Sequence, residues 1–176
     1  MLLKKKNYSK IKEIEKREQY VLYEYQPTLF HPLLLDFEPM RFVRRVRFLL
    51  EYLQKGKYLV YYLAEHDDFV AHCVVVPGGR KSQCTTEDDI VLGPYYVEKT
   101  KRGKGYSEIL IKRVLARYPF PYTCAFDYIA KSNIPSIRAS EKCGFKRYAE
   151  LDVVGVMRTP LLVDSGRYIV YRYEKA

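Results

Sequence analysis

Short runs of β-branched and aromatic residues alternate with polar turns along the first half of the chain. Residues 20–25 (YVLYEY) form one such run, and two more, at 58–64 and 69–76, flank the polar tetrapeptide 65–68. Runs of this length and composition predict strands, and a short polar link between two of them predicts an antiparallel hairpin. We therefore expect the first half of the chain to contribute three strands to a sheet.

Two other segments of the first half carry different patterns. From Phe42 to Leu53, apolar residues recur every three or four positions, with Pro39 before the segment and Gly56 after it. This spacing predicts an amphipathic helix that starts after the proline and ends at the glycine. Residues 1–18 are mostly charged, and we expect a lead-in that forms a short surface helix or a solvated tail.

Helices separate most of the strands expected in the second half. Residues 90–97 (IVLGPYYV) predict a strand with a Gly-Pro pair at its middle, and the missing proline N–H indicates a bulge or a parting of strands there. A glycine-containing loop and a helix with one apolar face follow, and residues 122–129 (YTCAFDYI) predict the next strand. Ser132 is expected to cap a short helix that ends at Gly144.

The last two strands are expected at 145–156 and 167–173, around a loop that contains Pro160 and Gly166. The resulting order of elements predicts a mixed α/β (α+β) fold, in which helices flank a mostly antiparallel sheet of six or seven strands. The length of the chain fits one domain, which we expect over residues 19–176.

Positive charge is concentrated in one part of the chain. The 176 residues include 31 Lys and Arg against 21 Asp and Glu, a formal charge of +10, and residues 99–147 alone carry a net +9. A local excess of this size indicates that an anion binds there. A nucleic acid is one such anion, and the 18 tyrosines would suit base stacking. No helix-turn-helix, zinc-finger spacing or RNA-recognition motif accompanies the charge, and this disfavours a nucleic-acid partner.

Cysteine spacing and the length of the apolar runs indicate the cellular location of the protein. The four cysteines are separated by 11, 40 and 19 positions, which fits neither a metal-binding pair nor a dense disulfide framework. We expect reduced thiols, no bound metal and a cytoplasmic protein. We find no signal-peptide core and no apolar run near the roughly 20 residues that cross a bilayer, so no membrane association is expected.

The loop at 99–105 (KTKRGKG) has the features of a phosphate-binding segment. It lies between a predicted strand and a predicted helix, where backbone N–H groups and the positive end of a helix dipole can face an anion. Gly103 and Gly105 have no side chain to hold a phosphate away from those groups. A Walker loop does not fit the spacing, and a dinucleotide fingerprint lacks its third glycine, where Glu108 stands.

Two segments together resemble a known family. Residues 97–107 (VEKTKRGKGYS), followed by an apolar-faced helix, are similar to the acetyl-CoA motif R/Q-x-x-G-x-G/A of the GNAT superfamily of N-acyltransferases. Residues 133–145 (NIPSIRASEKCGF) resemble that superfamily's second signature, N-x-x-S-I-x-x-x-E-K-x-G-F. The second segment lacks a tyrosine seven residues after its asparagine, and in this it is most similar to the branch that includes ribosomal-protein N-acetyltransferases.

The resemblance implies how the chain would bind acetyl-CoA, its expected co-substrate. The pantetheine arm would lie where the strands at 90–97 and 122–129 splay apart, and an N–H near Val97 would polarise the thioester carbonyl. Backbone of the first strand, amides of the glycine loop and flanking side chains would hold the rest of the molecule. The residues expected to bind it are Tyr95, Tyr96, Val97, Arg102, Gly103, Lys104, Gly105, Tyr106, Ser107, Glu108 and Asn133.

The implied reaction is direct attack of a primary amine on acetyl-CoA. The amine must first lose a proton, because an alkylammonium has a pKa of about 10.4. Asp127, on the strand at 122–129, is the candidate base. Many family members protonate the leaving thiolate with a tyrosine, and Ser140 stands at that place here, with a shorter and less acidic hydroxyl.

The acceptor is left open: an amino sugar, a small amine and a protein N-terminus all fit. It is expected to enter opposite the CoA, past a set of aromatic side chains, namely Phe30, Phe37, Tyr61, Tyr62, Tyr148 and Tyr171. A homodimer is also left open. Two other functions remain as alternatives: a basic nucleic-acid-binding module, motivated by the net charge, and a CoA-binding domain of this kind that has lost catalysis, suggested by Ser140.

Overall fold

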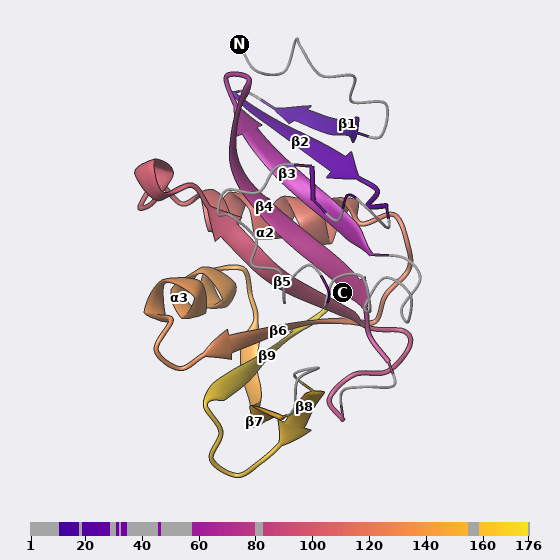
Figure 1. Cartoon of the computed structure of the whole chain (residues 1–176), viewed down its shortest axis with the longest axis vertical. Helices are drawn as coiled ribbons and strands as arrows, with labels where there is room; N and C mark the ends of the chain where they lie inside the picture. Colours follow the sequence, from indigo (N-terminus) through magenta and orange to yellow (C-terminus); the bar gives the residue numbers. More distant parts are fainter. Residues whose placement is uncertain are drawn as a thin grey trace. The chain divides into compact units, whose positions relative to one another are not determined.

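The computed structural model of the protein describes residues 11–17, 19–28, 31, 33–34, 46, 58–79, 83–154 and 159–175 (Figure 1). They belong to two compact units, one from Met1–Val75 with Pro94–Arg117 and the other from Val76–Gly93 with Tyr118–Ala176. The single domain expected over residues 19–176 stays a prediction. The amphipathic helix predicted after Pro39 lies outside the described residues, apart from Val46, which is helical.

The first unit is built on consecutive antiparallel strands. β1 (Ile11–Arg17) pairs with β2 (Tyr20–Tyr25), β2 with β3 (Leu59–Glu65), and β3 with β4 (Asp68–Pro77), whose last two residues belong to the second unit. The hairpin predicted from the sequence is confirmed in β3 and β4, and Tyr62 stands opposite His72 across it. α2 (Tyr106–Arg117) packs against β3 with a buried stripe that follows its helical period: Leu110, Ile111 and Val114.

The prediction for the charged segment at the start of the chain was wrong. Residues 11–17 form the strand β1, whereas the sequence predicted a surface helix or a solvated tail. Intrinsic propensity favoured neither strand nor burial in this run of lysine and glutamate. Pairing with β2, interrupted by one irregularity between Glu13 and Glu15, satisfies the backbone groups on one side of the strand and decides its conformation. The charged side chains suit an edge strand, because they oppose further pairing with another chain.

The second unit contains the first half of β5 (Ile90–Val97) and four more strands in the order β5, β6 (Cys124–Ala130), β9 (Tyr168–Glu174), β7 (Lys146–Val154) and β8 (Thr159–Leu162). β5 and β6 run parallel, and the other three pairs are antiparallel. α3 (Ile134–Lys142) packs against β6. The predicted mixed fold with a mostly antiparallel sheet is confirmed, although the described residues contain nine strands instead of six or seven.

Two local predictions for the second unit were wrong. Asn133, and not Ser132, is the N-cap of α3, because its side-chain oxygen accepts a hydrogen bond from Ser136 N at 3.4 Å. The stretch around Pro160, predicted as loop, forms β8 at the edge of the sheet. An edge strand tolerates proline because one side of its backbone needs no partner.

Gly166 joins β8 to β9 under a tight constraint. A Cβ added there would lie 2.2 Å from the backbone O of Leu151 and 2.5 Å from its carbonyl carbon. Relief requires movement of β7, so we expect Gly166→Ala to lower the free energy of unfolding by about 2–3 kcal/mol. Denaturant unfolding measures this change. The neighbouring Ser165→Ala is the control and should change stability little; equal stability of the two variants would contradict the close approach seen here.

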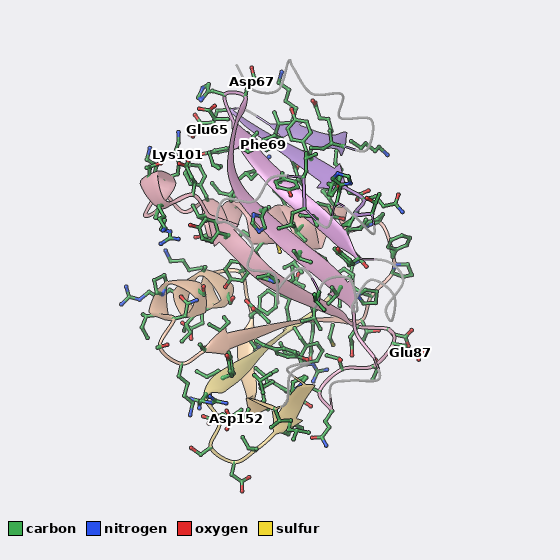
Figure 2. All side chains as sticks on the ribbon, in the orientation of Figure 1. Glu65, Asp67, Phe69, Glu87, Lys101 and Asp152 are labelled. Carbon is green, nitrogen blue, oxygen red and sulfur yellow. The ribbon has the colours of Figure 1, made fainter. Side chains whose placement is uncertain are left out.

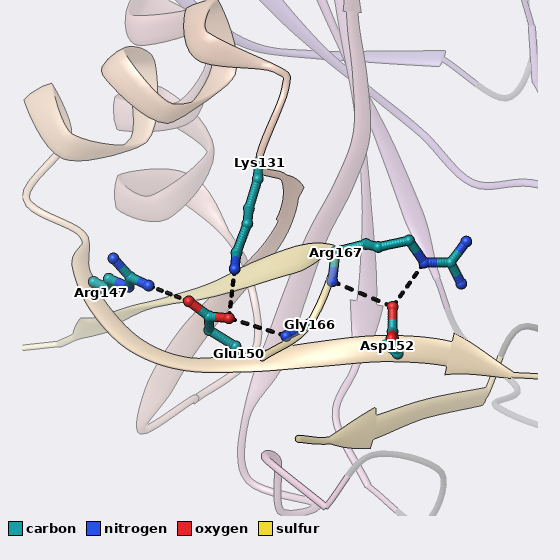
Figure 3. A network of polar contacts seen from close by, with 6 residues as sticks. All are labelled: Lys131, Arg147, Glu150, Asp152, Gly166 and Arg167. Carbon is teal, nitrogen blue, oxygen red and sulfur yellow. Dashed lines mark hydrogen bonds and ion pairs between the residues drawn. The ribbon is translucent and has the colours of Figure 1, made fainter. Parts of the chain in front are cut away.

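A network of charged side chains surrounds the same loop (Figure 3). Glu150 of β7 accepts hydrogen bonds from Lys131 Nζ at 2.6 Å, from Gly166 N at 3.0 Å and from Arg147. Asp152 accepts from Arg167 Nε at 2.8 Å and from Arg167 N at 3.2 Å. Hydrogen bonds from Lys131 and Gly166 hold the pKa of Glu150 below its usual value, and those from Arg167 do the same for the pKa of Asp152. The network thus ties β7 to the start of β9.

These lowered pKa values predict a loss of stability in acid. A carboxyl whose pKa is lower in the folded state stabilises the fold at pH values above its unfolded pKa, about 4.3 for Glu. That contribution disappears as the pH falls through the folded pKa. We expect the melting temperature to fall more steeply between pH 5 and pH 3 in the wild type than in Glu150→Gln, which cannot titrate there. Parallel melting curves of the two proteins across this range would show that the network does not contribute.

Candidate functional site

The glycine loop of the first unit has a backbone that requires glycine. It follows β5 and a short 3-10 helix, Lys99–Lys101, whose last residue is labelled in Figure 2. Gly103 has φ +82° and Gly105 has φ +79°, a region that costs other residues about 1–2 kcal/mol. A Cβ added at either glycine would meet nothing within 4 Å. The glycines are therefore needed for backbone conformation, and the space above them is open to a ligand.

The loop leads directly into the N-terminus of α2. The first helical hydrogen bond runs from Ile109 N to Gly105 O at 3.1 Å. The N–H groups of Tyr106, Ser107 and Glu108 thus lie in the first turn, where no carbonyl of the helix precedes them, and they carry the positive end of the helix dipole. The carboxylate of Glu108, which would repel an anion, pairs with Lys112 at 2.8 Å.

Tyr106 anchors the start of α2. Its side chain is buried, and its hydroxyl donates a hydrogen bond to Glu65 Oε2 at 2.6 Å. Glu65, at the end of β3, is labelled in Figure 2. This bond, together with burial, raises the pKa of Tyr106 to about 12, so the phenol stays protonated and continues to donate. Tyr20 contacts the same ring edge to face, with centroids 6.1 Å apart. The sequence predicted only that Tyr106 contacts the cofactor. Its anchoring hydrogen bond could not be predicted, because Glu65 lies 41 residues earlier in the chain.

Arg102 is exposed, yet two contacts hold its side chain. Nε donates to Val97 O at 3.2 Å, and the guanidinium lies over the ring of Tyr96, 5.1 Å from its centroid. Tyr96 in turn stacks on His72, a residue 2% exposed, with centroids 6.1 Å apart and planes 23° from parallel. This stack runs from the core of the first unit to the glycine loop. His72 is a core residue.

Ten of the eleven residues predicted to bind the cofactor therefore lie in one connected segment of the first unit, from Tyr95 to Glu108. The eleventh, Asn133, lies in the second unit, where its side chain is exposed and caps α3. In the part of the chain that the structure describes, no group of three or more His, Cys, Asp or Glu residues is placed to hold a metal ion.

The two candidate catalytic residues meet in the second unit. Ser140 Oγ donates a hydrogen bond to Asp127 Oδ2 at 2.6 Å, a length typical of a hydroxyl bonded to a carboxylate. Both side chains are buried: Asp127 is 3% exposed and Ser140 0%. The sequence selected each for a separate reason, and the structure brings them together between β6 and α3. The single hydroxyl proton of Ser140 is directed at Asp127.

The strand that carries Asp127 is paired with β5 over a short length only. The parallel pairing joins Ile90, Val91 and Leu92 to residues 125–127 of β6. Its last pair is Leu92 with Asp127, and Gly93 follows with φ +110°. The pairing therefore stops where the Gly-Pro pair stands, as the sequence predicted, and Asp127 lies at that point.

The predicted acceptor-lining aromatics that the structure describes differ in exposure and in their contacts. Tyr61 and Tyr62 are adjacent on β3 and so point to opposite faces of the sheet, and both are 0% exposed. Tyr171 is 3% exposed and donates a hydrogen bond to Glu141 Oε1 at 2.9 Å. Tyr148 is 52% exposed. Phe30 and Phe37 lie outside the described residues.

Comparisons with known proteins agree with the motifs. The model of the acetyltransferase (GNAT) family matches residues 14–145. No curated protein sequence matches the chain significantly. No described helix has the length and apolar character needed to cross a membrane.

Several solved structures share the fold at low sequence identity. An N-acetyltransferase from Staphylococcus aureus Mu50 is 18% identical, with 79% of this chain and 80% of that one covered and a TM-score of 0.54. The microcin C7 self immunity acetyltransferase MccE, in complex with acetyl-CoA and AMP, is 13% identical over 90% and 94%, with a TM-score of 0.57. An acetyltransferase from Thermus thermophilus is 12% identical over 78% and 77%, with a TM-score of 0.56.

Proposed function

The chain belongs to the acetyltransferase (GNAT) family, and we propose that it moves an acetyl group from acetyl-CoA to a primary amine. The observation that carries this proposal is the glycine loop: two glycines at positive φ, open space above them and the first turn of α2 directly behind. MccE, which shares the fold, is a structure with acetyl-CoA bound. Similarity to the ribosomal-protein branch and a cytoplasmic location rest on sequence alone and remain part of the proposal.

The residues of the loop would hold the cofactor by its phosphates. N–H groups from Gly103 to Glu108 would bind the pyrophosphate, since the positive end of the helix dipole lies here and no helical carbonyl precedes the first-turn N–H groups. Arg102 and Lys104, both exposed, would flank it. Backbone of Tyr95 and Tyr96, together with Asn133, would contact the pantetheine arm.

In the proposed reaction, the amine nitrogen attacks the thioester carbonyl, a C–N bond forms and the C–S bond breaks. The Val97 N–H would stabilise the negative charge on the carbonyl oxygen. Asp127, with Ser140 bonded to it, would take the proton that the amine loses. The CoA thiolate receives a proton in return, either through Ser140 or from water.

A second candidate is a domain that binds CoA without catalysis. The observation in its favour is the hydroxyl proton of Ser140, which points at Asp127 and is engaged there. Isothermal titration with acetyl-CoA tests the feature that both candidates share. Binding is expected, and its absence at millimolar cofactor, in protein shown to be folded, would remove both. A short RNA, titrated in parallel, tests the nucleic-acid alternative.

Arg102 is expected to contribute to cofactor affinity through its charge. Replacement by methionine removes the guanidinium and should raise the Kd for acetyl-CoA about tenfold, the effect of losing one hydrogen-bonded charge. The loss should shrink at high salt, because screening already weakens the wild-type interaction. Arg117→Met is the control: it removes the same charge at the other end of α2, from an arginine paired with Glu15 at 3.1 Å. Equal Kd values for the two variants would contradict a role for Arg102.

A further inference from the structure

The end of β3 is held by strands on both sides. Glu65, its last residue, stands opposite Tyr20 on β2 and opposite Asp68 on β4. A two-residue turn, His66 and Asp67, follows directly, and both of its residues have positive φ. Turns of this kind match the twist of the strands that they join. The backbone that carries the Glu65 carboxylate is therefore fixed in place.

Tyr106, the first residue of α2, contacts Glu65 and Tyr20 together. Directly opposite residues of an antiparallel pair project to the same face of the sheet, so the side chains of Tyr20 and Glu65 lie side by side. The Tyr106 hydroxyl bonds to the Glu65 carboxylate at 2.6 Å, and its ring meets the Tyr20 ring edge to face. The start of α2 is thus attached to two neighbouring strands.

A second residue of α2 contacts the same tyrosine of β2. Arg113 follows Tyr106 by seven positions, two helical turns, and so lies on the same side of the helix. Its guanidinium lies over the Tyr20 ring, 5.5 Å from the centroid, and Nη1 donates to Tyr20 O at 3.4 Å. These contacts hold α2 along β2, and the bond to Glu65 adds a fixed point at its first turn.

The hydroxyl of Tyr106 contributes orientation, in addition to the packing of the ring. A phenylalanine would bury the same ring against Tyr20 and would need no hydrogen-bond partner. A hydroxyl bonded to a carboxylate makes a short bond that is stronger than one between neutral groups. With a pKa raised to about 12, by this bond and by burial, Tyr106 keeps its proton at neutral pH. The bond therefore holds the first turn of α2 at one distance from the end of β3.

The turn that is fixed in this way carries the N–H groups beside the glycine loop. Those of Tyr106, Ser107 and Glu108 belong to the same turn of backbone as the Tyr106 side chain. A Cβ added at Gly103 or Gly105 would meet nothing within 4 Å, so packing around these two residues does not fix the donors. A ligand that needs several N–H groups at once benefits when they are aligned before it arrives.

We propose that Glu65 and Tyr106 are positioning residues for the cofactor: their hydrogen bond holds the first turn of α2 in the arrangement that binds the phosphates of acetyl-CoA. In this role neither side chain needs to touch a phosphate, because both act through the backbone N–H groups that follow Gly105. The inference rests on the proposed function, in which the glycine loop and this turn bind the pyrophosphate.

Titration calorimetry with acetyl-CoA on a matched pair of variants tests this role. Tyr106→Phe keeps the ring and removes the bond, so the aligned arrangement becomes only partly populated; a population of about one tenth would raise the Kd about tenfold. Tyr25→Phe is the control, because it removes a hydroxyl from another buried tyrosine of the first unit, one that donates to His31 O at 2.8 Å. Both variants should lose some thermal stability, and only Tyr106→Phe should bind acetyl-CoA more weakly.

Substitutions of Glu65 separate the hydrogen bond from a general loss of structure. Glu65→Gln keeps an oxygen that can accept from the hydroxyl, so its Kd should stay within about twofold of the wild-type value. Glu65→Leu removes the acceptor and should raise the Kd about tenfold. The double variant Tyr106→Phe/Glu65→Leu should have the Kd of Tyr106→Phe alone, since residues that act through one shared bond are not additive.

The wild-type titration separates this inference from the proposed function. If the wild type binds acetyl-CoA and Tyr106→Phe binds it equally well, the loop remains the phosphate site and the positioning role is refuted. Equal loss of affinity in Glu65→Gln and Glu65→Leu would also refute that role, and this comparison decides the question if Tyr106→Phe does not fold. Absence of binding by the folded wild type would contradict the proposed function, and the inference with it.

Discussion

Replacement of both Gly103 and Gly105 by valine is expected to remove measurable acetyl-CoA binding while the protein remains folded. Each glycine has a positive φ, near +80°, which a β-branched residue disfavours by about 1–2 kcal/mol. If the loop shifts to relieve this strain, its N–H groups no longer converge on the pyrophosphate. If the loop does not shift, the added side chains fill the open space that the anion needs. Either outcome should raise the Kd at least about 100-fold.

The control for this variant shares its backbone strain and belongs to the second unit. Gly79 has φ +111°, and a Cβ there would meet Glu87 Cγ at 3.5 Å, an ordinary contact. Gly79→Val should lower the melting temperature to a similar extent per substitution and keep the wild-type Kd. Titration calorimetry and thermal melts on the two variants measure both quantities. Tight binding by the Gly103/Gly105 variant would refute the loop as the phosphate site.

Asp127→Asn is expected to reduce kcat by about 10²–10⁴-fold, the usual contribution of a general base. The variant preserves shape, and the amide oxygen of asparagine can still accept the hydrogen bond from Ser140. A role confined to holding α3 against β6 would therefore survive the change. The affinity for acetyl-CoA should stay within about twofold of the wild type, because the phosphate loop is untouched. Steady-state kinetics, with the amine of a panel that is acetylated fastest, measure kcat for the two proteins.

Ser140→Ala completes this test. It removes the donor that lies 2.6 Å from Asp127 and leaves a buried carboxylate with one hydrogen bond fewer. Its melting temperature should fall more than that of Asp127→Asn, since loss of a hydrogen bond to a charged group costs about 1.5–3 kcal/mol. If Asp127→Asn keeps full kcat while Ser140→Ala is destabilised, the pair holds α3 in place and the base lies elsewhere.

Local sequence patterns predicted most of the elements near the proposed site. The elements around the glycine loop follow one another in the sequence: the strand that ends at Val97, the loop itself and the helix after it. Their order along the chain therefore determines which of these elements are neighbours. Asn133 and Gly144 likewise bracket α3, although the cap was assigned to Ser132, one residue early. Asparagine and serine cap helices about equally well, and composition alone does not choose between neighbours.

Contacts between distant parts of the chain could not be predicted from the sequence. Glu65 anchors Tyr106 across 41 positions, and Arg172 contacts Cys124 across 48. No periodic pattern in the sequence identifies such a pair, because each residue only has to be compatible with the strand or helix in which it lies. β1 was missed for the same reason: its charged residues become a strand through pairing with β2, not through propensity.

Catalysis is tested most directly by release of CoA thiol from acetyl-CoA across a panel of primary amines, with mass spectrometry of the amine product. The panel should contain amino sugars, small amines and peptides with a free N-terminus. We predict CoA release that depends on one class of amine, in step with the appearance of its acetylated product, and loss of both in the Gly103/Gly105 variant. Binding of acetyl-CoA with no release above the protein-free rate for any class would contradict acetyl transfer as the function of this chain.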